Sequence, residues 1–200
     1  MVRFLASVAV VLVLSACANN SATRVTEYLD PETAVTIRAV AAPIVFSHEA
    51  PELAANARDY VSAGLVEVNN MGKRVHYLAL VSWSTIDRQR PGATPPAIPG
   101  RVELSIAGKA HEFTPVTHEP RTLGIGAAPF RPASGYTGES WYRLSVDDLR
   151  ALSADPPARV ALTDDASNRV EYELWRSATD ELREFVRDVP DAPKAEAPRR

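Results

Sequence analysis

The stretch Tyr60–Thr85, YVSAGLVEVNNMGKRVHYLALVSWST, carries the strongest structural signal in this chain of 200 residues. Two runs rich in β-branched and aromatic residues, Tyr60–Val68 and Arg74–Thr85, flank the segment Asn69–Gly72. Asn and Gly tolerate the positive φ angles that hairpin turns require. In the second run both alternating sets of side chains are largely apolar, which is typical of a strand covered on both faces. The stretch therefore predicts a β-hairpin at the centre of a sheet.

Further strands are expected on both sides of this hairpin. Thr33–Val40 alternates between apolar and polar residues with a period of two, which predicts a half-buried strand. The same criteria predict six shorter strands: Ile44–Ser47, Val102–Ile106, Ala110–Val116, Ser140–Leu144, Val160–Thr163 and Arg169–Trp175. The second and third are expected to pair across the turn Ala107–Lys109, and the last two across the turn DDASN.

Helices are expected to be few and short. PELAANAR, residues 51–58, is a candidate for a brief helix. Ser145 and Asp148 form a variant capping box at the start of SVDDLRAL, and Ser177 with Asp180 resembles it at the start of the final helix. The final helix carries one apolar stripe before Pro190, formed by Ala178, Leu182, Phe185 and Val189. The predicted fold class is α+β and β-dominated: an antiparallel sheet or sandwich with two short C-terminal helices.

The N-terminus has the features of an export signal. Arg3 precedes an apolar run of eleven residues, Phe4–Leu14. This run is shorter than the roughly 20 apolar residues that span a bilayer, and it fits the hydrophobic region of a signal peptide, about 7–15 residues. The small residues Ser15 and Ala16 then lead into Cys17, the single cysteine of the chain.

The segment Leu14-Ser15-Ala16-Cys17 resembles the lipobox of bacterial lipoproteins. The resemblance implies cleavage between Ala16 and Cys17, a diacylglycerol thioether on Cys17 and acylation of the new amino group. The fatty chains, such as palmitate, would anchor the protein in a membrane. Because Ala18 rather than Asp follows the cysteine, the resemblance favours the outer membrane, facing the periplasm. The alternative is an ordinary signal peptide with an incidental cysteine.

These observations divide the chain into four parts. We expect a signal peptide (1–16), a lipidated tether (17–23), a single β-rich periplasmic domain (24–189) and a disordered, Pro-rich tail (190–200). The formal net charge is −3, with 22 Lys and Arg against 25 Asp and Glu. Without a basic excess, the sequence argues against a nucleic-acid partner. A lone cysteine cannot form an intrachain disulfide, so the fold must depend on its core.

No pattern of catalytic or metal-binding residues emerges. His111 and His118 are seven residues apart, which would place them on opposite faces of a strand, and no His-Glu-x-x-His motif is present. No Gly-x-Ser-x-Gly motif occurs, and Ser84 has no identifiable base. His76 lies among apolar residues and is interpreted as a core histidine with a hydrogen-bond partner. We therefore predict no catalytic residues, no metal and no cofactor.

Aspartate pairs and glycines have structural interpretations. Asp147 and Asp148 fit the first turn of a helix, where carboxylates favour the helix dipole. Asp164 and Asp165 fit a hairpin turn rather than a calcium loop. Gly124-Ile125-Gly126 lacks the strand and helix of a phosphate-binding loop.

A binding surface is the remaining functional feature. The tryptophans Trp83, Trp141 and Trp175 lie on predicted strands and could contact a ligand if exposed. Two Pro- and Gly-rich loops, Asp87–Gly100 and His118–Gly138, are candidate contact regions. The leading hypothesis is a lipid-anchored, non-catalytic envelope protein that binds a protein partner. The first alternative is a module that binds glycan or a small molecule through sheet aromatics, and a hydrolase is the third.

Overall fold

The computed structural model describes residues 23–86, 100–106, 108–130, 136–164 and 167–190. Its strands are β1 (Val25–Leu29), β2 (Thr36–Val40), β3 (Ile44–Glu49), β4 (Arg58–Asn70), β5 (Lys73–Ser84), β6 (Arg101–Ile106), β7 (Lys109–Phe113), β8 (Tyr136–Leu144), β9 (Arg159–Thr163) and β10 (Arg169–Arg176). Two helices, α2 (Val146–Ala154) and α3 (Thr179–Arg187), and one 3₁₀ turn, Pro120–Leu123, complete it. None of the described helices is long and apolar enough to cross a membrane.

The predicted central hairpin is confirmed as β4 and β5. The two strands pair in one continuous register from Asp59 opposite Ser84 to Asn70 opposite Lys73. The turn places Met71 and Gly72 at φ angles of 51° and 90°. The side chain of Asn69 accepts a hydrogen bond of 2.9 Å from the Gly72 N–H. Gly72 therefore takes the positive φ angle that the sequence predicts, whereas Met71 instead of an Asn takes the other, and Asn69 contributes through its side chain.

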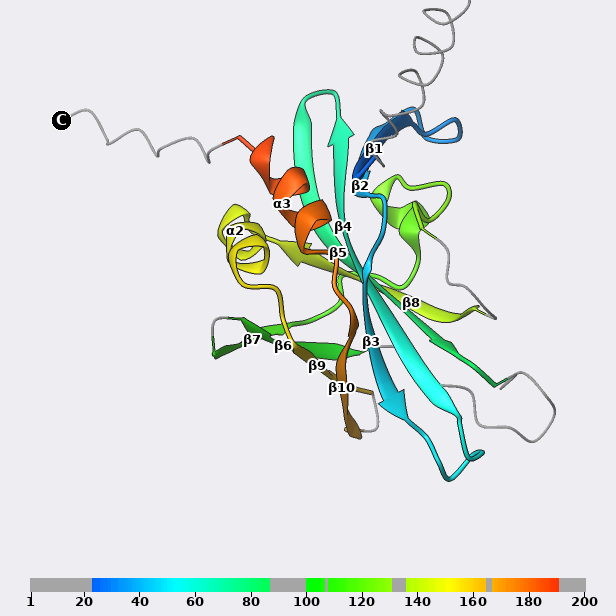
Figure 1. The fold of residues 1–200 in the computed structure, drawn as a ribbon. Coiled ribbons are helices and arrows are strands. Elements are labelled where there is room, and N and C mark those ends of the chain that lie inside the picture. Colours follow the sequence, from blue (N-terminus) through cyan, green and yellow to red (C-terminus); the bar gives the residue numbers. More distant parts are fainter. Residues whose placement is uncertain (1–22, 87–99, 107, 131–135, 165–166, 191–200) are drawn as a thin grey trace, which may run out of the picture.

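All ten described strands belong to one antiparallel sheet (Figure 1). One edge of β4 pairs with β5, which in turn pairs with β8. The other edge is shared, because β3 pairs with residues 58–63 and β2 with residues 66–69. From β3 the sheet continues through β10, β9, β6 and β7, and from β2 it ends in β1. The β-dominated α+β class with an antiparallel sheet is thus correct.

The main core lies on the face of the sheet that carries both helices. Val61, Ala63 and Leu65 of β4 point to this side with apolar residues of the neighbouring strands. Leu149 of α2 and Phe185 of α3 are fully buried against them. Figure 1 shows α2 and α3 next to each other. The helices therefore close the curled sheet over its largest apolar surface.

A second, smaller core lies on the opposite face. Val66, Val68, Ala79 and Val81 form its base together with Trp141. The segment that follows β7 covers it, with Ile125 fully buried and Phe130 nearly so. The central strands are thus covered on both faces at this end of the sheet, as their apolar sequence predicts.

Asp30 holds this cover in place. Its carboxylate accepts hydrogen bonds from the backbone N–H groups of Gly126 at 2.7 Å, Glu32 at 2.9 Å and Thr33 at 3.1 Å. Burial alone would raise the pKa of Asp30, but these hydrogen bonds outweigh it and lower the pKa below the usual value. The turn between β1 and β2 is therefore tied to the cover over the second core.

The capping box at the start of α2 is confirmed. The Asp148 N–H donates to Ser145 Oγ at 3.1 Å, and the Ser145 N–H donates to Asp148 Oδ2 at 2.9 Å. The apolar stripe of α3 is also confirmed, since Ala178, Leu182, Phe185 and Val189 are all buried.

Three details of the prediction are wrong. The helix predicted at residues 51–58 is absent: residues 51–56 form turns and Arg58 already begins β4, because Glu49 and Arg58 are paired neighbours and the chain must reverse direction between them. Ser177 does not cap α3: its hydroxyl bonds that of Thr179, and Ala178 takes the cap position without a side-chain hydrogen bond. Strand β1 was not predicted, since VTEYL is a short, half-polar strand at the edge of the sheet.

Several predicted parts lie outside the described residues. These parts are the signal peptide with Ala16 and Cys17, most of the tether, the tail after Pro190 and residues 87–99 of the first long loop.

Candidate functional site

The structure separates the three candidate tryptophans. Trp175 of β10 has 57% of its surface exposed, and Trp83 of β5 is half-buried. Trp141 of β8 is completely buried, so its prediction as a binding-surface residue is wrong. The reason is that its side chain points into the second core, which Ile125 covers. A period-two pattern cannot reveal such a cover, because the covering segment lies elsewhere in the chain.

Trp83 is part of a stacked aromatic pair. The register of the central hairpin places it directly opposite Tyr60. The two rings are nearly parallel, with an interplanar angle of 10° and centroids 4.2 Å apart. The Trp83 indole N–H also donates to Ser62 Oγ at 3.0 Å. Tyr60 is buried, and the stacking and the hydrogen bond hold the two rings in one orientation.

Trp175 reaches the same place from β10. The register of β10 against β3 shifts between Leu174 and Arg176, which leaves Trp175 as the extra residue of a bulge. Its ring meets Tyr60 edge to face, with centroids 6.1 Å apart at 78°. Three strands thus bring three aromatic side chains together, although their positions are far apart in the sequence.

An ion pair completes the group. The guanidinium of Arg58 lies over the Trp175 ring, 4.8 Å from its centroid. The same guanidinium binds Glu49 Oε1 at 2.9 Å. We refer to Tyr60, Trp83, Trp175, Arg58 and Glu49 as the aromatic surface. Arg58 is restrained from two sides and still remains about one-third exposed.

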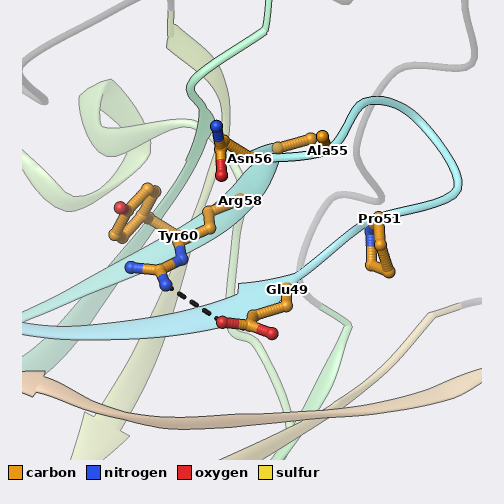
Figure 2. A pocket seen from close by; sticks show the side chains of 7 residues that line it. Glu49, Pro51, Ala55, Asn56, Arg58 and Tyr60 are labelled. Carbon is orange, nitrogen blue, oxygen red and sulfur yellow. Dashed lines mark hydrogen bonds and ion pairs between the residues drawn. The ribbon is translucent and has the colours of Figure 1, made fainter.

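A cavity of about 310 Å³ adjoins the aromatic surface. Figure 2 shows Arg58 of β4 and Glu49 of β3 joined across the two strands. The cavity is lined by Glu49, Pro51, Ala55, Asn56, Ala57, Arg58 and Tyr60. Its volume is at the lower end of the range for small-molecule sites, about 300–1,000 Å³. The end of β3 supplies a carboxylate (Glu49) to its wall, the turns between β3 and β4 an amide (Asn56), and the start of β4 a guanidinium (Arg58).

A second, more open cavity of about 520 Å³ lies where β5 and β8 approach the start of α2. His76 lines it and is buried, with its Nε2 donating to Glu67 Oε2 at 3.0 Å. Burial would raise the pKa of Glu67, but the hydrogen bond from His76 and the charges of Arg74 and Arg38 lower it overall. The interpretation of His76 as a core histidine with a partner is confirmed.

The other histidines make separate contacts. His48 Nδ1 lies 3.0 Å from the Glu171 carbonyl oxygen, His111 Nδ1 lies 4.0 Å from Asp148 Oδ1, and His118 Nδ1 lies 2.8 Å from Ser140 Oγ. Within the described ranges, no three His, Cys, Asp or Glu side chains come together as metal ligands. Ser140 is fully buried and Ser84 nearly so. A substrate therefore cannot reach the Ser140 hydroxyl that contacts His118.

The second candidate loop is only partly a surface feature. Residues 118–130 contribute Ile125 and Phe130 to the second core, which makes this segment a cover over the sheet. Residues 131–135 and residues 87–99 of the first loop lie outside the described residues.

The sequence analysis missed Tyr60, Arg58, Glu49 and Asn56 as site residues. One signal was available: counting back from the turn pair Asn70–Lys73 places Tyr60 opposite Trp83. The arrival of Trp175 and Arg58 beside them depends on the pairing of β10 with β3, which has no local signal.

Comparisons of the chain with models of protein families, with curated proteins and with solved structures found no match.

Proposed function

We propose that this chain is a lipid-anchored, non-catalytic binding protein of the bacterial cell envelope, and that its ligand binds at the aromatic surface. The observation that carries the proposal is the convergence of Trp175, Tyr60 and Trp83 around Arg58, beside a polar cavity. The anchor follows from the resemblance of Leu14–Cys17 to a lipobox.

The composition of the aromatic surface supports binding. Trp, Tyr and Arg are the residue types most enriched among those that dominate binding energies. An exposed Trp that is already held by a neighbouring ring and a guanidinium loses little conformational freedom when a ligand covers it. Trp175 meets this description, because Tyr60 and Arg58 contact its ring and more than half of its surface is open.

Two kinds of occupant remain candidates for this surface. The first is another protein of the envelope, for which the lipid-anchored domain would act as an accessory. The second is a glycan or small molecule, which is favoured by the grouping of aromatic side chains next to a cavity. A hydrolase has less support, because Ser84 and Ser140 are both buried.

Site-specific photocrosslinking in living cells tests the proposal. A photoreactive amino acid replaces Trp175 in the full chain, and crosslinked material is purified and analysed by mass spectrometry. The matched control carries the same amino acid at Met71, which is fully exposed at the tip of the central hairpin. We expect a discrete adduct, either protein or glycan, from position 175 only. Equal labelling at both positions, or no adduct at 175, would contradict the proposal.

A further inference from the structure

We infer that the ligand of the aromatic surface is a neutral carbohydrate, with one sugar ring stacked on Trp175 and its hydroxyl groups bound by Glu49, Asn56 and Arg58. This inference rests on the proposed binding function and specifies its ligand class. It draws on the strand pairing, the chemistry of the side chains and the local balance of charge.

The strand pairing at this place disfavours an extended peptide. Residues 58–63 of β4 are paired on one edge with β3 and on the other, from Asp59 on, with β5. Strand β3 is in turn paired with β4 and with β10. A peptide that adds a strand needs an open edge with free backbone groups. At β3 and β4 the ligand is therefore expected to approach the face of the sheet and to be bound by side chains.

The side chains at this face combine a flat apolar ring with planar polar groups. The exposed part of the Trp175 indole, which Arg58 leaves uncovered, offers an apolar surface to the C–H groups of a sugar ring. Glu49 offers a carboxylate and Asn56 an amide, and Arg58 offers a guanidinium. Each of these planar groups can form two hydrogen bonds in its own plane. Neighbouring hydroxyl groups of a sugar present donors and acceptors at a matching spacing.

The two charged groups of the aromatic surface are paired with each other, which favours a neutral ligand. Arg58 pairs with Glu49 at 2.9 Å, and on the adjoining strands Arg159 pairs with Glu173 at 3.6 Å. An acidic ligand would compete with Glu49 for Arg58, and a basic ligand would compete with Arg58 for Glu49. A neutral polyhydroxyl ligand can bind both partners without separating them.

The size of the cavity indicates a short segment of glycan. Its volume of about 310 Å³ is bounded by the small residues Pro51, Ala55 and Ala57. The ring stacked on Trp175 can direct its hydroxyl groups into this cavity while the neighbouring sugars remain in solvent. With few buried ligand atoms, we expect a dissociation constant between about 10 µM and 1 mM.

Calorimetric titration of the purified full-length protein tests the inference. The probes are neutral tetrasaccharides of N-acetylglucosamine, glucose and mannose, with tetragalacturonic acid as the acidic comparison. The detergent must lack a sugar headgroup. We expect at least one neutral tetrasaccharide to bind, and we expect Trp175→Ala to weaken its binding about tenfold or more. Leu174→Ala is the matched control, because Leu174 is the adjacent exposed apolar residue of the same strand, and it should bind as the wild type does.

Glu49→Gln provides a test that a purely structural role would not pass. This change leaves Arg58 without its carboxylate partner while the shape of the cavity is kept. We expect the variant to gain binding of tetragalacturonic acid at least threefold relative to the wild type. An unchanged preference would contradict the role of charge balance in ligand selection.

The outcomes separate this inference from the proposed function. If none of the neutral probes binds but photocrosslinking at position 175 captures one discrete protein, the carbohydrate inference fails and the binding function stands. If only the acidic probe binds the wild type, the inference also fails. If neither sugars nor crosslinked partners are found, both proposals fail.

Discussion

Gly64 illustrates how one residue permits the second core to form. It lies in the middle of β4, where a glycine usually weakens a strand. Here a Cβ atom at this position would overlap the ring of Phe130, whose Cε1 and Cζ are its nearest neighbours. Phe130 is buried and belongs to the segment that covers the sheet. Because Gly64 has no side chain, the Phe130 ring can occupy the space that a Cβ atom would take.

We predict that Gly64→Ala lowers the free energy of unfolding by about 1–3 kcal/mol, the usual cost of overpacking a core. Urea denaturation followed by circular dichroism measures the change. The control is the same substitution in a Phe130→Ala background, where the ring is absent. If the cost of Gly64→Ala is as large there, the steric explanation is wrong.

Glu67 links a single residue to the pH dependence of stability. Its carboxylate is buried between His76 and Arg74, and its pKa in the folded protein is lowered below the ordinary 4.5. When the pKa of a carboxyl group is lower in the folded than in the unfolded state, the ionised group stabilises the fold. This contribution is fully present at pH values above the unfolded-state pKa and is lost as the pH falls through the folded-state pKa. Acidification below about 4.5 therefore removes it.

We predict that Glu67→Gln is less stable than the wild type at pH 7 and that the difference shrinks as the pH falls below 4.5. The variant has no carboxylate at this position to protonate, so it lacks this part of the pH dependence. Urea denaturation of both proteins between pH 3 and pH 7 measures it. A difference in unfolding free energy that stays constant over this range would contradict the prediction. The lowered pKa of Asp30 affects both proteins equally.

At the scale of elements, Arg38 of β2 fastens helix α3 to the sheet. Its guanidinium donates to the carbonyl oxygen of Phe185 at 2.8 Å and of Glu184 at 3.3 Å, and to Asp188 Oδ2 at 3.0 Å. It also lies over the Phe185 ring, 4.7 Å from the centroid. The last carbonyl groups of a helix lack partners within it, and a cation there is favourable. The buried side chain of Arg38 thus donates hydrogen bonds to two backbone carbonyl groups in the last turn of α3.

We predict that Arg38→Met costs about 2–3 kcal/mol of unfolding free energy, because charge-assisted hydrogen bonds to buried carbonyl groups are lost. Compared with the wild type, the amide hydrogens of α3 in Arg38→Met should exchange faster, and those of the central hairpin should change less. Asp180→Asn is the control, since it breaks only the exposed ion pair between Arg24 and Asp180. It should change stability by less than about 1 kcal/mol. Unchanged exchange in α3 of Arg38→Met would refute the role of this residue.

The elements differ in how well local patterns predicted them. The β4–β5 hairpin and the cap of α2 follow from neighbouring residues, namely the turn segment Asn69–Gly72 and the Ser145–Asp148 pair. The stripe of α3 follows from a helical period. Strand β1 and the turns of residues 51–56 were missed, because their conformations depend on pairing with β2 and on closing the β3–β4 connection.

At the scale of the whole molecule, the expected lipid anchor decides where the binding surface is displayed. We predict that Cys17→Ala, expressed with a cleavable ordinary signal peptide in place of residues 1–16, moves the protein from the detergent phase to the aqueous phase in cell extracts. Each buried CH₂ of an acyl chain contributes about 0.8 kcal/mol to membrane binding, and several chains make it stable. Phase partitioning with immunodetection measures this. Asn19→Ala, just outside the Leu14–Cys17 segment, is the control and should stay in the detergent phase. A Cys17→Ala protein that also stays there would contradict the anchor.

The candidate site depends on the tertiary structure of the whole domain. Trp83 and Trp175 could be named from the sequence because aromatic residues on strands are recognisable locally. Their exposure and the burial of Trp141 could not, since the cover over the second core comes from residues 118–130. Tyr60, Arg58 and Glu49 became site residues only when β3, β4 and β10 paired.

The chain's local order therefore specified the central hairpin, the short helices and the β-dominated class, because turn chemistry, capping and periodicity act over a few residues. The resemblance to a lipobox likewise depends on four consecutive residues. The division of one edge of β4 between β2 and β3, the bulge that presents Trp175 and the cover over Trp141 came only with the tertiary structure. These features depend on contacts between distant segments, and each segment's own pattern is compatible with several pairings.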